Sequence, residues 1–172
     1  LARCSGARTI TSVEMDKVYA DGFQEVVKAI KAKNIEVHNN RITEREYKAE
    51  MVIALAMIHW MYSCTELFGS LDKVISYLRS LTNNVLLTEW IAPDDPAVVS
   101  FKHTGYNPEV KKAEYSKENF DEAMLANFGK VEYVGDLTQT RGIYLGYTHL
   151  GVEGHGATSQ IFINRKNKVV GK

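Results

Sequence analysis

Residues 51–60 read MVIALAMIHW, and the first eight of these form the longest apolar stretch of the chain. A short, almost wholly apolar run fits a parallel strand covered on both faces better than a strand with one face in water. It is far too short to cross a membrane, which takes about 20 apolar residues in a helix. The sequence therefore predicts a buried strand over residues 51–58 that ends at His59 and Trp60.

A strand, a helix and a second strand are predicted before this stretch. The β-branched run 9–13 and residues 35–38 are typical of strands. Between them, apolar residues recur at helical offsets, which predicts an amphipathic helix. Its apolar stripe consists of Tyr19, Phe23, Val26, Val27 and Ile30.

Further elements of both kinds are predicted after it. A helix over residues 71–81 and a strand over 85–90 are followed by the segment 92–115. This segment holds all three prolines and should be mostly irregular and exposed, as functional loops often are. A last helix is expected between a cap at Ser116 and a stop at Gly129.

The final pair of strands is predicted to be antiparallel. Residues 131–134 and 142–147 have the composition of strands, and the connection between them is too short for a crossover helix. The order of elements is therefore an α/β pattern that closes with an antiparallel pair.

Composition and charge fit a single globular domain. The chain has 172 residues, of which 45% are hydrophobic, and its 21 basic residues balance its 21 acidic ones. It can bury a sizeable core, and a zero net charge gives no sign of a polyanion-binding protein. Two cysteines are too few for a disulfide scaffold, and no amino-terminal signal pattern is seen. These features predict a soluble cytoplasmic protein without a membrane partner.

The order of elements resembles the class I S-adenosylmethionine-dependent methyltransferases over about residues 1–148. The resemblance implies a Rossmann-like fold with a mainly parallel sheet, an antiparallel last strand and flanking helices. Residues 149–172 would form a tail, with a possible hairpin. The matching pieces are SVEMD at residues 12–16, IALAMIHW at 53–60, LLTEWIAPDD at 86–95, VEYVGD at 131–136 and RGIYLGY at 141–147.

One element of that family has no counterpart here. The family's first strand and its glycine-rich turn are missing, because Leu1 already lies in a stretch that looks like the end of the following helix. In the family this strand lies between the second and the fourth, so its loss would open a gap in the sheet. We therefore expect the natural protein to contain it, as part of a longer, multidomain chain. The sequence also has a more distant similarity to sugar O-methyltransferase domains of large algal DNA viruses. This similarity would explain why the sequence looks like a fragment of a longer chain.

The resemblance assigns the cofactor, S-adenosyl-L-methionine, to residues that follow the early strands. Glu14 would accept hydrogen bonds from both ribose hydroxyls; alternatively it is an acid favoured at a helix start. Asn39 and Asn40 would lie beside the adenine amino group, or else form an ordinary turn pair. Met57 is also assigned to the cofactor.

The acceptor side of the site is expected around His59. A neutral imidazole can take a proton near neutral pH, which methylation of a hydroxyl requires. The alternative is a core histidine bonded to the backbone. Glu89 would orient or assist this base, or be a capping or ion-paired acid. Trp60 would stack on the acceptor, or cover the chain beneath it.

Asp94, Asp95 and His103 complete the predicted site from the proline-containing loop. They would bind the acceptor, although a solvated surface loop is the better explanation for any one of them. The five histidines lack the spacing of a zinc site and there is no Cys-x-x-Cys, so no metal is predicted.

These residues predict a methyltransferase that acts on a hydroxyl of a small molecule or a glycan. Residues 59–62 read HWMY where enzymes that methylate nucleobase amines commonly carry an Asp-Pro-Pro-Tyr type tetrapeptide, so that substrate class is disfavoured. A nucleic-acid methyltransferase remains an alternative, and so does a non-catalytic scaffold. The first would need a basic cluster such as Lys28, Lys31, Arg41 and Lys48.

Overall fold

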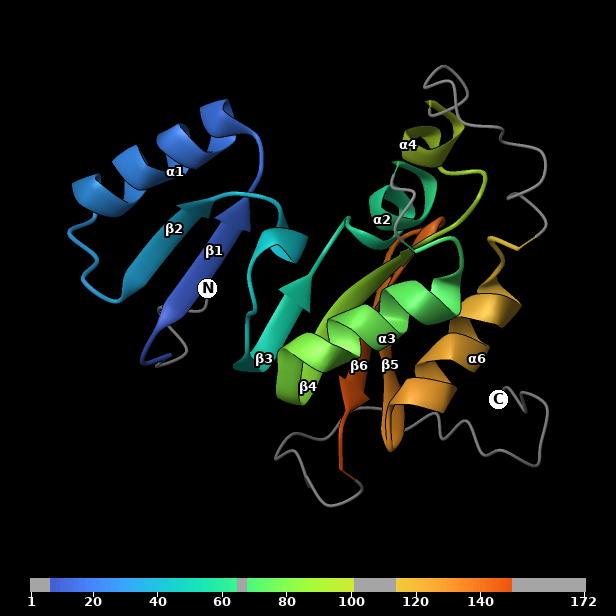
Figure 1. Ribbon diagram of the computed structural model, residues 1–172. Coiled ribbons are helices and arrows are strands. Elements are labelled where there is room, and N and C mark those ends of the chain that lie inside the picture. Colours follow the sequence, from blue (N-terminus) through green and yellow to red (C-terminus); the bar gives the residue numbers. More distant parts are fainter. Residues whose placement is uncertain (1–6, 65–67, 101–113, 150–172) are drawn as a thin grey trace. The chain divides into compact units, whose positions relative to one another are not determined.

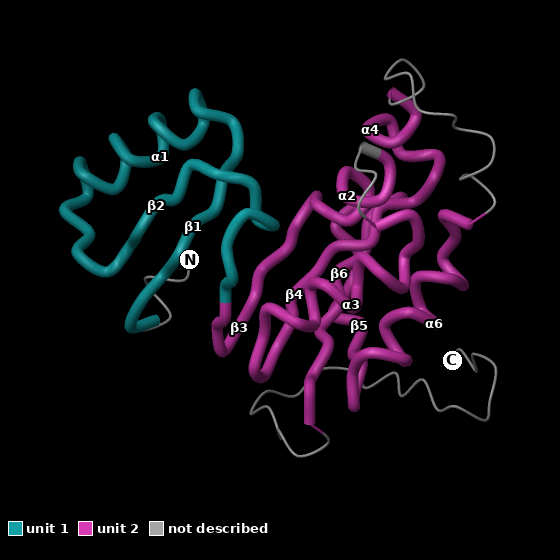
Figure 2. The backbone as a smooth tube through the Cα atoms, viewed as in Figure 1, with its two compact units in different colours: residues 1–47 teal, residues 48–172 magenta. Residues whose placement is uncertain are grey.

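The computed structural model describes residues 7–64, 68–100 and 114–149. The chain divides into two compact units, Leu1–Tyr47 (unit 1) and Lys48–Lys172 (unit 2), drawn in teal and magenta in Figure 2. Each unit has its own sheet. Within the described ranges, no helix combines the length and the apolar character needed to span a bilayer.

Unit 1 is a strand–helix–strand unit, as the sequence predicted. β1 (Ile10–Glu14) and β2 (Ile35–Asn39) pair in parallel, and α1 (Lys17–Ala29) connects them. A short 3-10 helix, η1 (Ile42–Glu44), follows. The side chain of Asp16 caps α1 by accepting the backbone N–H of Val18, so the helix begins at a residue type that favours a helix start.

The face of α1 that packs shares only Val27 with the predicted apolar stripe. Ala20 is fully buried, and Gln24 and Val27, four and seven residues further on, are half-buried. Tyr19 is 71% exposed and Phe23 is 38% exposed. The small side chain of Ala20 lets the helix approach its strands closely, which leaves the larger apolar residues outside.

Unit 2 contains a four-stranded mixed sheet in the order β3-β4-β6-β5. β3 and β4 are parallel, whereas β6 runs antiparallel to both β4 and β5, which confirms the predicted closing pair. The strands are β3 (Ala49–Ala54), β4 (Thr82–Ile91), β5 (Lys130–Thr138) and β6 (Arg141–Tyr147). The helices are α2 (Ile58–Cys64), α3 (Leu71–Leu81), α4 (Pro96–Val99) and α6 (Lys117–Asn127).

Two helices cover one face of this sheet. Figure 1 shows α3 and α6 side by side in front of the strands, and both helices begin with a serine cap, Ser70 and Ser116. Burying their apolar side chains against the sheet is the main stabilising term in this unit. The buried helical residues are Leu71, Val74, Ile75, Leu78 and Leu81 of α3, and Phe120, Ala123 and Met124 of α6.

Aromatic rings fill the centre of this core. The Trp90 ring on β4 lies 4.9 Å from the Tyr115 ring and 5.1 Å from the Phe120 ring. Gly146 on β6 lets the ring of Phe128 come close to the strand backbone, because a Cβ at position 146 would lie only 2.7 Å from Cγ of Phe128. The ring of Phe128 therefore rests directly on the backbone of the strand.

The strand predicted over residues 51–58 is shorter than expected. β3 ends at Ala54, and residues 58–64 form the helix α2, so His59 and Trp60 are helical rather than at a strand end. An apolar run does not by itself distinguish a strand from a buried helix. The spacing of Ile58, Met61 and Tyr62, all buried, is the helical signal that the apolar run conceals.

β1 and β3 are each paired along one edge within the described residues. On β3, Met51 is 47% exposed and Ile53 is 53% exposed.

The predicted boundary at residue 148 lies at the end of the described ranges, and the tail from residue 150 lies outside them. That boundary and the hairpin stay predictions.

Candidate active site

The carboxyl ends of β1 and β2 lie next to each other in unit 1. Glu14, the last residue of β1, is opposite Asn39, the last residue of β2, in the parallel register. Nδ2 of Asn39 donates to the carbonyl oxygens of Glu14 and Met15, at 3.0 and 3.2 Å. The structure therefore brings two predicted cofactor-binding residues together, and Asn39 holds the chain where it leaves β1.

The carboxylate of Glu14 also has a local contact. Its Oε1 accepts the backbone N–H of Asp16 at 2.8 Å, just before α1 begins. An ionised carboxylate offers about four acceptor positions. This single contact therefore leaves the acceptor capacity that two ribose hydroxyls would need.

Asn40 follows β2 and is held by its neighbours. The hydroxyl of Tyr47 donates to Oδ1 of Asn40 at 3.0 Å and lies 3.2 Å from Nδ1 of His38. Nδ2 of Asn40 donates to the carbonyl oxygen of Arg41 at 2.6 Å. The amide oxygen expected beside an adenine therefore already has one donor, and a ligand would use its second lone pair.

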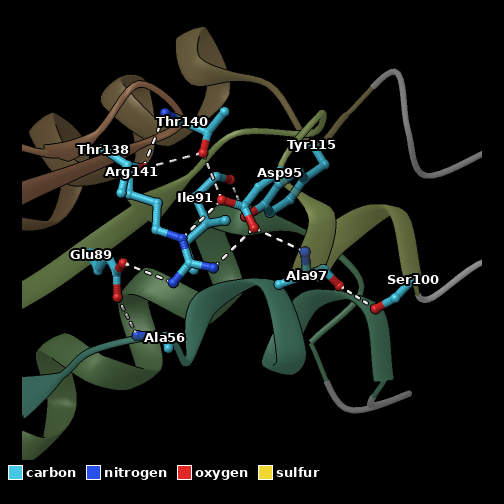
Figure 3. Close-up of polar contacts among 10 residues, drawn as sticks. All are labelled: Ala56, Glu89, Ile91, Asp95, Ala97, Ser100, Tyr115, Thr138, Thr140 and Arg141. Atoms are coloured by element: carbon cyan, nitrogen blue, oxygen red, sulfur yellow. Dashed lines mark hydrogen bonds and ion pairs between the residues drawn. The ribbon is translucent and has the colours of Figure 1, made fainter.

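In unit 2, Glu89 holds the turn that follows β3. This residue is on β4 and only 4% exposed, and its Oε2 accepts the backbone N–H of Ala56 at 2.8 Å (Figure 3). Ala56 has φ 52°, a left-handed conformation that is uncommon for residues other than glycine. Met57, which is 37% exposed, comes next and directly precedes α2. Glu89 thus reaches from one strand to the turn beyond its parallel neighbour.

Arg141 links Glu89 to a second buried carboxylate. Its Nε and Nη2 donate to the two oxygens of Asp95 at 2.8 and 2.9 Å, and its Nη1 lies 3.6 Å from Oε1 of Glu89. Asp95 also accepts the hydroxyl of Thr140 at 2.6 Å and caps α4 through the N–H of Ala97. These donors, Arg141 first, hold the pKa of Asp95 well below its usual range.

His59 lies in the first turn of α2 and is 2% exposed. Burial first, and then the positive charge of Arg141, lower its pKa to about 4, while Asp95 acts in the opposite direction. The ring is therefore neutral at pH 7, which is the form that accepts a proton. It is also much less basic than an ordinary histidine.

The predicted acceptor-binding residues lie in different surroundings. Trp60 is 48% exposed, and its ring centroid is 5.9 Å from that of His59. Asp94 is exposed, whereas its neighbour Asp95 is the residue buried in the ion pair. His103 lies outside the described residues.

Sequence reasoning missed Arg141 as a site residue. It belongs to RGIYLGY, one of the pieces that carry the resemblance, but no sequence spacing connects it with Asp95 or Glu89. Only the pairing of β4 with β6 brings them together. Within residues 7–64, 68–100 and 114–149, no group of three or more His, Cys, Asp and Glu side chains could hold a metal ion.

No protein-family model and no curated protein matches the sequence. Among solved structures, magnesium protoporphyrin IX methyltransferase from Synechocystis PCC 6803 with bound SAH is similar, with a TM-score of 0.57 and 11% identity over 84% of this chain and 66% of that one. A protein of Nostoc punctiforme PCC 73102, described as a candidate O-methyltransferase, has a TM-score of 0.56 and 12% identity over 85% of this chain and 46% of that one. PKMT2 from Rickettsia typhi in complex with AdoHcy has a TM-score of 0.51 and 12% identity over 83% of this chain and 44% of that one.

At these identities the likeness concerns the fold. The chain has the Rossmann-like fold of S-adenosylmethionine-dependent methyltransferases, as the order of its elements predicted. It spans less than two thirds of the length of each of these structures.

Proposed function

We propose that this chain is the core of an S-adenosylmethionine-dependent methyltransferase that acts on a hydroxyl of a small molecule or a glycan, in the cytoplasm. The observation that carries the proposal is a chain of methyltransferase fold in which an acidic residue, Glu14, ends β1 opposite Asn39 at the end of β2. In open α/β sheets, ligands bind outside the carboxyl ends of the strands.

Glu14, Asn39, Asn40 and Met57 would hold the cofactor. The chemistry of these residues fits it: Glu14 has free acceptor capacity for the ribose hydroxyls, Asn40 has an amide oxygen with a second lone pair, and Met57 is an exposed apolar side chain. When bound, S-adenosylmethionine supplies an electrophilic methyl group on a sulfonium sulfur. The chain has to hold the acceptor oxygen in line with that methyl group and exclude water.

His59 would remove the proton of the acceptor hydroxyl. It is neutral at pH 7, since its pKa is about 4, and it lies in a helix that starts at the turn held by Glu89. A base gains efficiency when its pKa lies near the working pH. Its contribution is therefore expected at the lower end of the range of about 10² to 10⁴ that general bases supply. Alignment would provide most of the acceleration, and Trp60 and Asp94 would contact the acceptor.

Calorimetric titration with S-adenosylhomocysteine on the full natural protein tests the cofactor site. Glu14→Gln keeps an acceptor for the N–H of Asp16 but removes the charge, so binding should weaken about tenfold or more. The matched control is Glu36→Gln, an exposed glutamate in the middle of β2, which should bind as the native protein does. No binding by the native protein would refute the methyltransferase and favour a non-catalytic scaffold.

A panel of acceptors tests the reaction itself. Transfer of labelled methyl groups from S-adenosylmethionine should occur with monosaccharides or phenols and not with amines that carry no hydroxyl, such as adenine. Transfer to amines alone would overturn the assignment to hydroxyls. With the acceptor that the native protein methylates, His59→Asn should lower turnover at least tenfold, while its affinity for S-adenosylhomocysteine stays within twofold of native. Near-native turnover of this variant would show that His59 takes no part in the mechanism.

The described residues include the four basic side chains considered for a nucleic-acid substrate. Lys28 is ion-paired with Glu25 at 2.7 Å, and Nζ of Lys48 donates to the carbonyl oxygen of Ser80 at 2.6 Å. Two of the four basic residues considered for a phosphate-binding face therefore have local partners.

A further inference from the structure

The turn between β3 and α2 needs support from outside itself. Ala56 has φ 52°, and a residue with a side chain adopts this conformation only where its surroundings hold it there. Its backbone N–H is bound by Oε2 of Glu89, on the neighbouring strand. The conformation of the turn therefore depends on where the Glu89 carboxylate lies.

That carboxylate depends in turn on Arg141. A carboxylate that is 4% exposed is costly to bury unless a cation or further donors lie beside it. Nη1 of Arg141 lies 3.6 Å from Oε1 of Glu89, the oxygen that the turn does not use. Figure 3 shows the guanidinium between the carboxylates of Glu89 and Asp95.

The strand register explains why an arginine at this position reaches both acids. Arg141 pairs with Ile91 in the antiparallel ladder, so Glu89, two residues before Ile91, is its diagonal neighbour on the same face of the sheet. Diagonal neighbours are within reach of long side chains. Asp95, which is 3% exposed, fixes the other side of the guanidinium through two hydrogen bonds.

We infer that Arg141 is a positioning residue: held by Asp95, it places Glu89 on the backbone of Ala56 and so fixes the turn from which α2 begins. Because α2 carries His59 and Trp60, Arg141 would also affect methyl transfer, and this part of the inference rests on the function proposed above. The role requires the planar fork of an arginine. A lysine would supply the charge, but its single nitrogen cannot make the paired hydrogen bonds to Asp95 and also face Glu89.

Amide hydrogen exchange at Ala56, measured by NMR on the full natural protein, tests the inference without any ligand. Arg141→Met and Arg141→Lys should both exchange at Ala56 at least tenfold faster than the native protein. The matched controls are Arg45→Met and Arg45→Lys, which change an exposed arginine and should leave Ala56 unchanged. Should Arg141→Met fail to fold by circular dichroism, Arg141→Lys decides. Native exchange at Ala56 in the folded Arg141 variants would overturn the inference.

A rescue experiment separates positioning from a general loss of stability. Glu89→Gln keeps an oxygen that accepts the N–H of Ala56 but has no charge to neutralise, so its hold on the turn no longer requires Arg141. The double variant Glu89→Gln/Arg141→Met should therefore exchange at Ala56 within about threefold of Glu89→Gln alone. Exchange as fast as in Arg141→Met would overturn the inference, because the arginine would then act by another route.

Activity provides the last measurement. Turnover of Arg141→Lys should fall at least tenfold, while its affinity for S-adenosylhomocysteine should fall much less, because Met57 is the one proposed cofactor residue at this turn. Equal losses in both would overturn the effect on methyl transfer. If the native protein bound no S-adenosylhomocysteine, the proposed function would fail, and the exchange data would still decide whether Arg141 positions the turn.

Discussion

The two units of the chain differ in how much of their apolar surface they bury. In the described part of unit 1, Ala20 is the only buried residue, and Tyr19 and Phe23 are largely exposed. In unit 2, two helices and a ring cluster around Trp90 and Phe120 form a dense core. Because tight packing makes a region rigid and costly to open, unit 2 has the more stable scaffold of the two.

The candidate residues are found in both units. The proposed cofactor residues Glu14 and Asn39 lie on the sparsely packed unit, whereas Glu89, His59 and Arg141 lie on the dense one. Groups on a rigid base hold their geometry without a ligand, and groups on a loosely packed base are ordered more by binding. We therefore expect substitutions in unit 2 to lower the free energy of unfolding more than substitutions in unit 1.

The largest effect is expected in the core of unit 2. Phe120 is fully buried and touches both Trp90 and Tyr144. Phe120→Ala should lower the free energy of unfolding by about 3 to 5 kcal/mol, because it removes apolar contacts and leaves a cavity. Urea denaturation followed by tryptophan fluorescence measures this. A loss under about 1 kcal/mol would mean that the core is not the rigid part of the molecule.

Acid should weaken unit 2 through His59. Its pKa is about 4 in the folded protein and about 6.5 in the unfolded chain, so between these pH values the unfolded chain binds more protons. The contribution of neutral His59 to the free energy of unfolding is fully present above pH 6.5. It is lost as the pH falls toward 4, and the loss amounts to up to about 3 kcal/mol. Thermal unfolding from pH 7 to 4.5 measures this dependence.

Two asparagine variants serve as the test and the control for this pH dependence. In His59→Asn the slope between pH 6.5 and 4.5 should largely disappear. In His38→Asn, a substitution in unit 1 that retains His59, it should persist. An unchanged slope in His59→Asn would show that other groups cause the loss in acid.

The smallest effect on stability is expected when a phenylalanine of unit 1 is replaced by alanine. Phe23→Ala removes a ring that is 38% exposed on α1, so it should cost less than about 1 kcal/mol. Amide hydrogen exchange in α1 measures the stability of this unit by itself. A cost equal to that of Phe120→Ala would break the comparison, since it would reveal that a further segment buries α1.

The order and type of most elements could be predicted from local signals. The serine cap at Ser116, the helical stripe of α3 and the short connection between β5 and β6 all gave correct predictions. The helix α2 could not be separated from β3, because a run of apolar residues satisfies both periods. The buried face of α1 was wrong, because apolar size suggests a core position but the close approach uses Ala20.

The candidate site was only partly predictable. Glu14 and Asn39 were expected at strand ends and lie at the ends of β1 and β2, whereas Glu89, also expected at a strand end, lies inside β4, which continues to Ile91. Their roles in a site stay predictions. The sequence analysis considered both Asp94 and Asp95 and favoured Asp94, and only the structure shows that Asp94 is the exposed acid and Asp95 the buried one. Arg141 depends on which strand lies beside β4, and this is a long-range property that no local pattern contains.

The contact between Phe128 and Gly146 has a consequence for sequence variation. A Cβ at position 146 would lie 2.7 Å from the ring of Phe128, so the strand tolerates a side chain there only when the ring becomes smaller or moves. Positions 128 and 146 are therefore expected to covary in homologous proteins, with a large residue at one accompanied by glycine at the other. Such coupled substitutions would record the packing of the residue that follows α6 against the backbone of β6, in sequences for which no structure is known.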